Sequence, residues 1–251
     1  MAYVPILQED FERGGKMDDD DDNEYNLEDD FAYRNNVANA PKAIRLGFMR
    51  KVYGLLTMQL LLTTIVAAAC MYTIPLKTFV QTNVWMVSLS MILSFVLLIA
   101  LHIKRKDTPA NLILLAGFTI VEAYTIGMIV SFYDKEVVIQ ALFLTLAVVG
   151  GLTLFSFQTK RDYSSAYSVL FAGLCVLFIG GILQLFLQSN GLEMIIAIGG
   201  AFLFSMFIVV DTHLMMHHIS PEEYILATIN LYLDIINLFL HILRILQASK
   251  N

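Results

Sequence analysis

Three carboxylates lie inside long apolar stretches of the sequence: Glu122, Asp211 and Asp234. A charged side chain at the centre of a membrane-spanning helix costs about 2.5–3.5 kcal/mol on insertion scales. Such a group therefore faces the protein interior or a water path, and each of the three is a candidate functional residue. Glu122 keeps two interpretations, a second cation site along a path or a buried acid bonded to a neighbouring helix.

Asp234 belongs to a polar stripe in the last apolar stretch. Five polar residues recur there at intervals of four, three, four and three: Asn230, Asp234, Asn237, His241 and Arg244. This spacing keeps them on one face of a helix whose other residues are mostly Leu, Ile, Phe and Tyr. A polar face at membrane depth must turn towards protein or water. Two interpretations stay open: the stripe lines an ion path, or it is a hydrogen-bonded seam between helices.

Asp211 and Asp234 form a candidate pair. Asp211 lies near the end of the sixth apolar segment, and Asp234 lies about ten residues, or roughly 15 Å, into the seventh. Antiparallel helices joined by a short turn can bring the two carboxyl groups together, although the spacing alone does not show that they meet. If they do meet, the following chemistry applies. Two close carboxylates do not easily both ionise, so the pair titrates as one unit. Protonated, it clamps two helices; deprotonated, it repels and offers oxygen ligands suited to Ca²⁺, which predicts a pH-sensing gate and a metal site.

Two further chemistries are not expected from this sequence. His213 and His217 have the i, i+4 spacing of zinc ligands, but no Glu follows His213 as the zincin motif requires. Two membrane aspartates also suit an intramembrane aspartyl protease. Residues 231–233, however, read Leu-Tyr-Leu before Asp234, where those enzymes have Gly-x-Gly. We therefore expect no enzyme activity and no catalytic residue.

The elements that must position these residues are transmembrane helices. About 20 apolar residues are needed to cross the hydrocarbon core, and seven segments satisfy this criterion. They are residues 52–73, 84–103, 111–132, 137–157, 165–187, 192–211 and 224–246. The chain is 57% hydrophobic and only 15% charged, whereas soluble domains carry about a quarter charged residues. The sequence predicts an all-α integral membrane bundle over residues 42–251.

Residues 1–41 are predicted to be a disordered, acidic, cytosolic tail. They hold 12 of the 22 acidic residues, including the run Asp18–Asp22, and few aliphatic ones. The net charge of −6 therefore describes the tail, and it gives no indication of nucleic-acid binding. The role of the Asp18–Asp22 run stays open.

Lysine and arginine near the segment ends indicate the orientation. One side holds Lys42, Arg45, Arg50, Lys51, Lys104, Arg105, Lys106, Lys160 and Arg161. The other holds Lys77 and Lys135 before the last segment. This bias predicts a cytosolic N-terminus and a cytosolic, histidine-rich turn at 213–224. We expect the last segment to cross fully, with a re-entrant path as the alternative.

Several segments carry a family signature. Residues 207–213 (FIVVDTH), 220–224 (SPEEY) and 230–244 (NLYLDIINLFLHILR) stand near the C-terminus, and 27–31 (LEDDF) and 48–53 (FMRKVY) stand near the start. Together they resemble the transmembrane BAX inhibitor motif family, in its lifeguard branch and most closely the Golgi members of that branch. The resemblance covers nearly the whole chain after residue 26.

The resemblance implies a fold, an activity and site residues. The family fold has seven helices with the last one central. Its members act as calcium leak channels of the Golgi, endoplasmic reticulum or other membranes, and they restrain apoptosis by lowering stored calcium. The family's pH-sensing pair falls on Asp211 and Asp234, and acidic positions tied to conduction in the Golgi members fall on Glu222 and Asp234. Val210 stands where the family usually has Tyr, which weakens any role for a tyrosine hydroxyl there.

The sequence therefore predicts a pH-modulated calcium leak channel of Golgi or endoplasmic reticulum membranes, with Ca²⁺ as the transported ion and no cofactor. Residues expected to line or support the route, besides the aspartate pair, are Glu122, Glu222, Asn230, Asn237 and His241. The alternative is a non-conducting membrane interaction protein that regulates apoptosis by binding intracellular calcium-release channels or apoptosis regulators. Both share a lipid environment, and the oligomeric state stays open.

Overall fold

The computed structural model describes residue 37, residues 42–159, residue 163 and residues 166–250. Apart from Val37, the predicted acidic tail of residues 1–41 lies outside this part. Val37 is buried, and its backbone N–H donates to the carbonyl of Ile219 at 3.1 Å.

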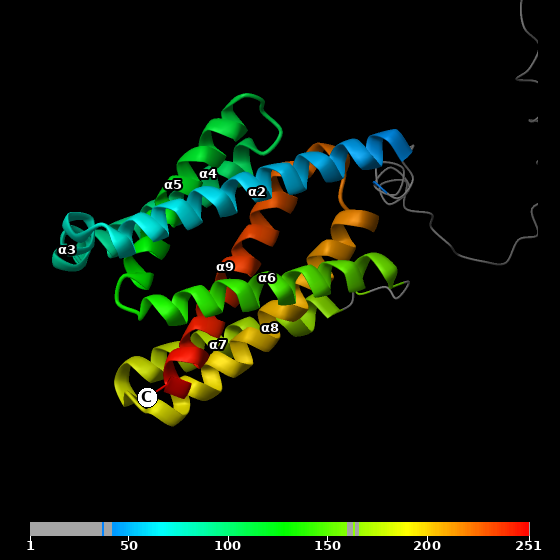
Figure 1. The fold of residues 1–251 in the computed structure, drawn as a ribbon. Helices are drawn as coiled ribbons and strands as arrows, with labels where there is room; N and C mark the ends of the chain where they lie inside the picture. The colour runs from blue at the N-terminus through cyan, green and yellow to red at the C-terminus, as the bar shows by residue number, and fades with distance from the viewer. Residues whose placement is uncertain (1–36, 38–41, 160–162, 164–165, 251) are drawn as a thin grey trace, which may run out of the picture. The chain divides into compact units, whose positions relative to one another are not determined.

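The described elements are helices (Figure 1). Their bounds are α2 (Lys42–Tyr72), α3 (Ile74–Thr82), α4 (Trp85–Lys104), α5 (Ala110–Val130), α6 (Lys135–Gln158), α7 (Ala166–Leu187), α8 (Asn190–His217), the short 3-10 helix η2 (Pro221–Glu223) and α9 (Tyr224–Lys250). Seven of the described helices are long and apolar enough to cross a membrane, which confirms the predicted bundle.

The structure corrects the prediction at three places. The first helix, α2, begins at Lys42, whereas the first span was predicted to begin at residue 52. The short helix α3 between the first two spans was not predicted, because nine residues are too few for the apolar-run criterion. The sixth span does not end at Asp211, because α8 continues to His217. Met215 and Met216 are buried in this extension, so packing of apolar side chains carries the helix past the polar residues. The histidine-rich turn predicted at 213–224 therefore begins as helix.

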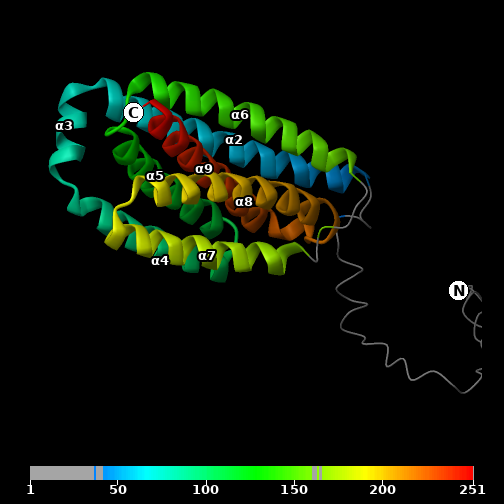
Figure 2. The ribbon, with the colours of Figure 1, turned by 90° about the horizontal axis from the view of Figure 1, so that it is seen from below.

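Helix α9 is the interior element of the bundle (Figure 2). It packs against α8, α6 and α2, with smaller contacts to α4 and α5. In the most apolar stretch of α9, 72% of the residues are buried, whereas the value for α7 is 6%. Helix α9 is therefore central and α7 is peripheral. A polar side chain on α9 is consequently surrounded by protein.

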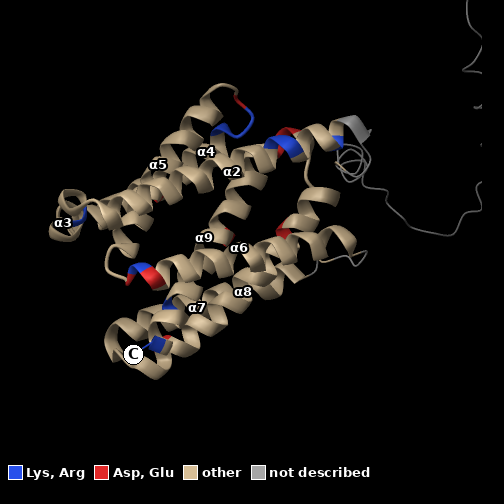
Figure 3. Cartoon of the chain, viewed as in Figure 1, with Lys and Arg blue, Asp and Glu red and all other residues tan. Residues whose placement is uncertain are grey.

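Ion pairs show that α9 runs from one end of the bundle to the other. At its start, Arg105 lies 3.2 Å from Glu223. At its end, Lys250 lies 2.9 Å from Asp134, and Asp134 follows α5 whereas Arg105 precedes it. The 27-residue helix is unbroken and about 40 Å long at 1.5 Å per residue, so it does not fold back as a re-entrant segment would. Figure 3 shows most charged residues at these helix ends.

Candidate functional site

Asp211 of α8 and Asp234 of α9 meet inside the bundle. The two helices form an antiparallel hairpin closed by η2, and the carboxyl groups lie within hydrogen-bonding reach of each other. The residues are 8% and 7% exposed. One oxygen of each, Oδ1 of Asp211 and Oδ2 of Asp234, is buried without a hydrogen-bond partner in the described part of the chain. The site therefore consists of two acids that are shielded from solvent. Each of them keeps one oxygen atom that can still accept a hydrogen bond.

Side chains from three other helices lie along the segment of α8 that carries Asp211. Tyr53 of α2 lies beside Thr212, the residue after Asp211, and Tyr167 of α7 lies close enough to both aspartates to interact with them electrostatically. On α6, the Ser156 hydroxyl donates to the Val209 carbonyl at 3.0 Å. Thr212 is fully buried, so protein encloses the hairpin beside the acidic pair. No pattern in the sequence indicated Tyr53 or Ser156, because their roles depend on which helices become neighbours.

The rest of the predicted stripe is divided between interior and surface. His241 is buried, and its ring stacks on Phe204 of α8 at a centroid distance of 5.6 Å. The same ring fills the space where Gly200 would carry a side chain. Asn237 is half-buried and donates to the Leu233 carbonyl of its own helix at 2.8 Å. Asn230 and Arg244, at the two ends of the stripe, are exposed.

Glu122 belongs to a second polar centre on the opposite side of α9. It is half-buried on α5 and accepts a hydrogen bond from the Ser94 hydroxyl of α4. Tyr232, buried on α9, is close enough to interact electrostatically with Glu122 and hydrogen-bonds the Thr63 hydroxyl of α2 at 2.8 Å. Of the two interpretations of Glu122, the bonded buried acid matches the observed contact. Nothing in the sequence pattern indicated Ser94, Thr63 or Tyr232, since hydroxyl side chains are common in apolar helices.

Glu222 lies at the exposed end of the hairpin, away from the aspartate pair. Its carboxylate is 3.9 Å from the Lys106 ammonium group, and its side chain is largely exposed. The neighbouring Glu223 is less exposed and forms the closer ion pair with Arg105. The turn between α8 and α9 therefore faces the basic connection between α4 and α5.

The histidines of α8 form a ring stack. The rings of His213 and His217 are 4.3 Å apart between centroids, and Tyr163 meets the His213 ring edge-on at 5.7 Å. Among the described residues, no three His, Cys, Asp or Glu side chains gather to hold a metal ion. Ca²⁺ in proteins takes six to eight oxygen ligands, so the two aspartates alone suit a passing ion better than a resident one.

This arrangement defines a polytopic membrane protein whose interior helix carries an acidic pair in the protein core. The sequence model of the family Bax1-I, described as "Inhibitor of apoptosis-promoting Bax1", matches residues 45–251, and the chain belongs to that family. It is thus a multi-pass membrane protein of the BAX inhibitor group, as the resemblance in the sequence indicated.

Individual relatives agree with this membership. The "Golgi anti-apoptotic protein" of Vaccinia virus (strain Lister) is 46% identical over 224 residues, 89% of this chain and 94% of that protein. "Protein lifeguard 4" of Mus musculus is 46% identical over 222 residues, 88% of this chain and 93% of that one. "Bax inhibitor 1" of Schizosaccharomyces pombe is 37% identical over 225 residues, covering 89% and 84%.

Proposed function

We propose that this protein is a pH-modulated calcium leak channel of Golgi or endoplasmic reticulum membranes that lowers stored calcium and thereby inhibits apoptosis. The observation that carries the proposal is the buried contact between Asp211 and Asp234, each with one free oxygen. The family description and the names of the relatives support the anti-apoptotic role. The Golgi relative supports the compartment.

The gate works through the charge of the aspartate pair. With one proton shared, the two carboxyl groups form a hydrogen bond that holds α8 against α9. When that proton leaves, two like charges remain in surroundings of low dielectric constant and repel each other. Tyr167 of α7 faces both aspartates, and its neutral hydroxyl does not offset that repulsion. Rising pH therefore separates the helices and frees carboxylate oxygens for a passing Ca²⁺.

The proposed route follows α9 from the end that carries Glu222. We place this end on the cytosolic side, because it also holds Arg105 and Lys106, in accordance with the positive-inside rule. Asn230 lies one helical turn before Asp234, and Asn237 and His241 follow it along the same face. Contact of the His241 ring with Gly200 and Phe204 closes the route beyond the pair. Glu122 supports α9 from the opposite side.

Flux measurements on purified protein in liposomes test this proposal. We expect Ca²⁺ efflux to rise with pH, by up to about tenfold per pH unit for a gate controlled by one proton. Asp234→Asn keeps a neutral hydrogen-bonding group of the same shape but cannot lose a proton, so flux should stay low at every pH. Glu193→Gln, which removes an exposed carboxylate near the start of α8, is the matched control and should leave the pH response intact. Unchanged pH-dependent flux in Asp234→Asn would rule out the gate.

One observation favours the non-conducting alternative. The His241 ring of α9 stacks on Phe204 of α8, which is a contact that a seam between helices requires. In that case the protein would act by binding calcium-release channels or apoptosis regulators. The same liposomes separate the two functions, because a seam predicts no flux at any pH from the purified protein.

A further inference from the structure

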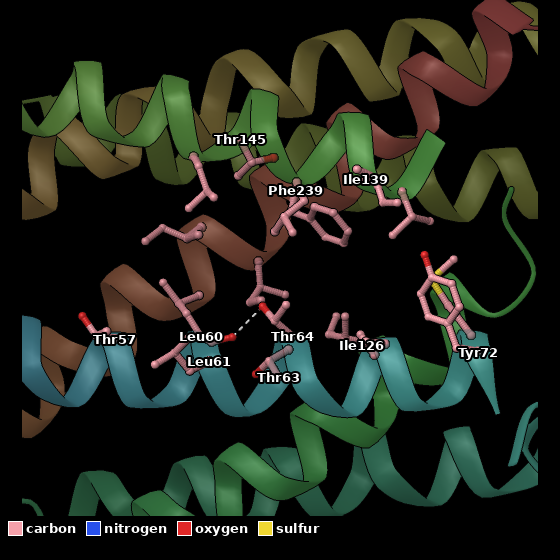
Figure 4. Close-up of a pocket in the computed structure, with 18 residues that line it drawn as sticks. Thr57, Leu60, Leu61, Thr63, Thr64, Tyr72, Ile126, Ile139, Thr145 and Phe239 are labelled. Atoms are coloured by element: carbon pink, nitrogen blue, oxygen red, sulfur yellow. Dashed lines mark hydrogen bonds between the residues drawn. The ribbon is translucent and has the colours of Figure 1, made fainter. Parts of the chain in front are cut away.

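A groove runs along the membrane-spanning part of the bundle between α2 and α6, with α9 as its floor (Figure 4). Its volume is about 450 Å³. Floor residues such as Thr63, Ile235 and Phe239 are buried, whereas Leu61, Thr64 and other rim residues on α2 and α6 are exposed. The groove therefore opens sideways, towards the surface that faces lipid in a bilayer.

The lining offers the occupant almost only hydrocarbon. Four threonines line the groove, and each donates its hydroxyl to a carbonyl one turn earlier on its own helix: Thr57, Thr63, Thr64 and Thr145. Their methyl groups consequently complete a wall otherwise formed by Leu, Ile, Val, Ala, Met and aromatic residues. Water does not stably fill an apolar cavity, and the few hydroxyl groups here fall short of the six to eight oxygen ligands that Ca²⁺ takes. The groove is thus distinct from the aspartate site.

The shape of the groove suits an extended chain. Thr57 and Tyr72 mark its two ends on α2, 15 positions or about 22 Å apart at 1.5 Å per residue. This length lies within the roughly 30 Å of a bilayer's hydrocarbon core. A hydrocarbon chain, about 4–5 Å wide by its van der Waals contacts, can lie along the groove between α2 and α6.

A positive charge stands at one end of the groove. The Lys135 ammonium group lies 4.6 Å from the centre of the Tyr72 ring, at the end of the bundle where α6 begins. The neighbouring carboxylates of Asp134 and Glu136 are engaged by Lys250. Lys135 is therefore placed to meet an anionic phosphate at the membrane surface while a chain extends inwards from it.

We propose that this groove binds one acyl chain of a bilayer phospholipid. The headgroup lies by Lys135, and the chain runs between α2 and α6 to rest on α9. There it contacts Ile235 and Ile236, which directly follow Asp234, and the Thr63 side chain that bonds Tyr232. The bound acyl chain then packs against the central helix α9. Its binding does not depend on whether the protein conducts calcium.

Tryptophan fluorescence in liposomes tests the proposal. Trp85, the only tryptophan of the chain, is first changed to Phe. Phe239→Trp then places a reporter on the groove floor, and Phe207→Trp places one in the α8 core; both phenylalanines are 8% exposed, so they are matched for burial. In phosphatidylcholine with brominated acyl chains, we expect the Phe239→Trp signal to be quenched at least twofold more than the Phe207→Trp signal. Equal quenching would overturn the proposal.

A blocking variant makes the test specific to the groove. Thr64→Phe fills the rim and should reduce quenching of the Phe239→Trp signal to the Phe207→Trp level. Leu62→Phe, on an exposed position of the same helix outside the groove, should change nothing. Quenching that persists in Thr64→Phe, or that occurs with a brominated sterol instead of the phospholipid, would contradict acyl-chain binding.

A second measurement covers the case in which Phe239→Trp fails to fold. Phosphatidylcholine with a photoactivatable diazirine in its acyl chain should label groove residues of the unmodified protein, and Thr64→Phe should reduce that labelling at least fivefold. Labelling spread evenly over the lipid-facing helices would overturn the proposal. Neither readout involves calcium, so failure of the leak and failure of the lipid site are separate results.

Discussion

The two sides of α9 bury polar groups in different ways. Towards α8, Asp234 meets a second acid and His241 meets the backbone of Gly200, and Asp234 Oδ2 and His241 Nδ1 have no hydrogen-bond partner among the described residues. Towards α2 and α5, Tyr232 bonds Thr63, and Ser94 satisfies Glu122. A buried acid with a hydroxyl partner holds helices together in one state. Two acids facing each other hold the helices together only while they share a proton. The contact between α8 and α9 is therefore the one that we expect to change with pH.

The largest expected effect comes from filling the space between α8 and α9. In Gly200→Val the new side chain occupies the position of the His241 ring, so the ring or the helix must move. Overpacking of this kind costs about 1–3 kcal/mol, and we expect the thermal midpoint in detergent to fall. Gly199→Ala is the matched control, because its added carbon meets only an ordinary contact at 3.9 Å.

A double variant distinguishes this collision from a general effect on the helix. His241→Ala should restore most of the stability lost in Gly200→Val, because the two side chains compete for one space. If the losses simply add, the α8 contact is not the tight one and the comparison between the two sides of α9 fails.

The next prediction contrasts the acids themselves. Asp211→Asn should remove the pH response of the Ca²⁺ flux, which we expect to be up to about tenfold per pH unit. Glu122→Gln should leave that response in place, because Gln still accepts the hydrogen bond from Ser94. Flux should be measured at matched protein density over a range of pH. A response lost in Glu122→Gln and kept in Asp211→Asn would reverse the assignment of the two sides.

On the other side of α9, loss of a hydroxyl should have a smaller and purely structural effect. Tyr232→Phe removes the hydrogen bond to Thr63 and should destabilise the protein by about 1 kcal/mol, the usual net value for such a bond. Thermal unfolding checks the stability, and the flux should keep its pH profile. A changed profile would show that the two sides are coupled through α9.

The sequence was sufficient for the helices and for singling out the two aspartates, for physical reasons. Apolar length alone predicts seven spans, and a carboxylate within a span is a candidate functional residue because burying it is costly. A short turn makes the helices of Asp211 and Asp234 antiparallel neighbours, but the spacing alone left their contact open. The side chains around the pair could not be predicted, since Tyr53 and Tyr167 come from other helices whose faces the sequence does not place.

The stripe on α9 shows where periodicity stops being informative. It placed five residues on one face, but Asn230 and Arg244 are exposed whereas Asp234 and His241 are buried. Which part of a helical face is covered depends on the length of the neighbouring helices, which the 3-4 spacing does not encode. For the same reason the end of α8 could not be predicted. Buried methionines extend this helix beyond Asp211.

The smallest expected effect concerns the ends of α9, where neither side dominates. Arg105→Met removes the partly exposed ion pair with Glu223, and such pairs contribute about 0–1 kcal/mol. We therefore expect little change in thermal stability, measured at low salt where the pair is least screened. Lys104→Met, which removes only a local pair with Asp107, is the control. If Arg105→Met instead lowers stability as much as Gly200→Val, then the hairpin turn, and not the contact between Gly200 and His241, fixes how α8 and α9 meet.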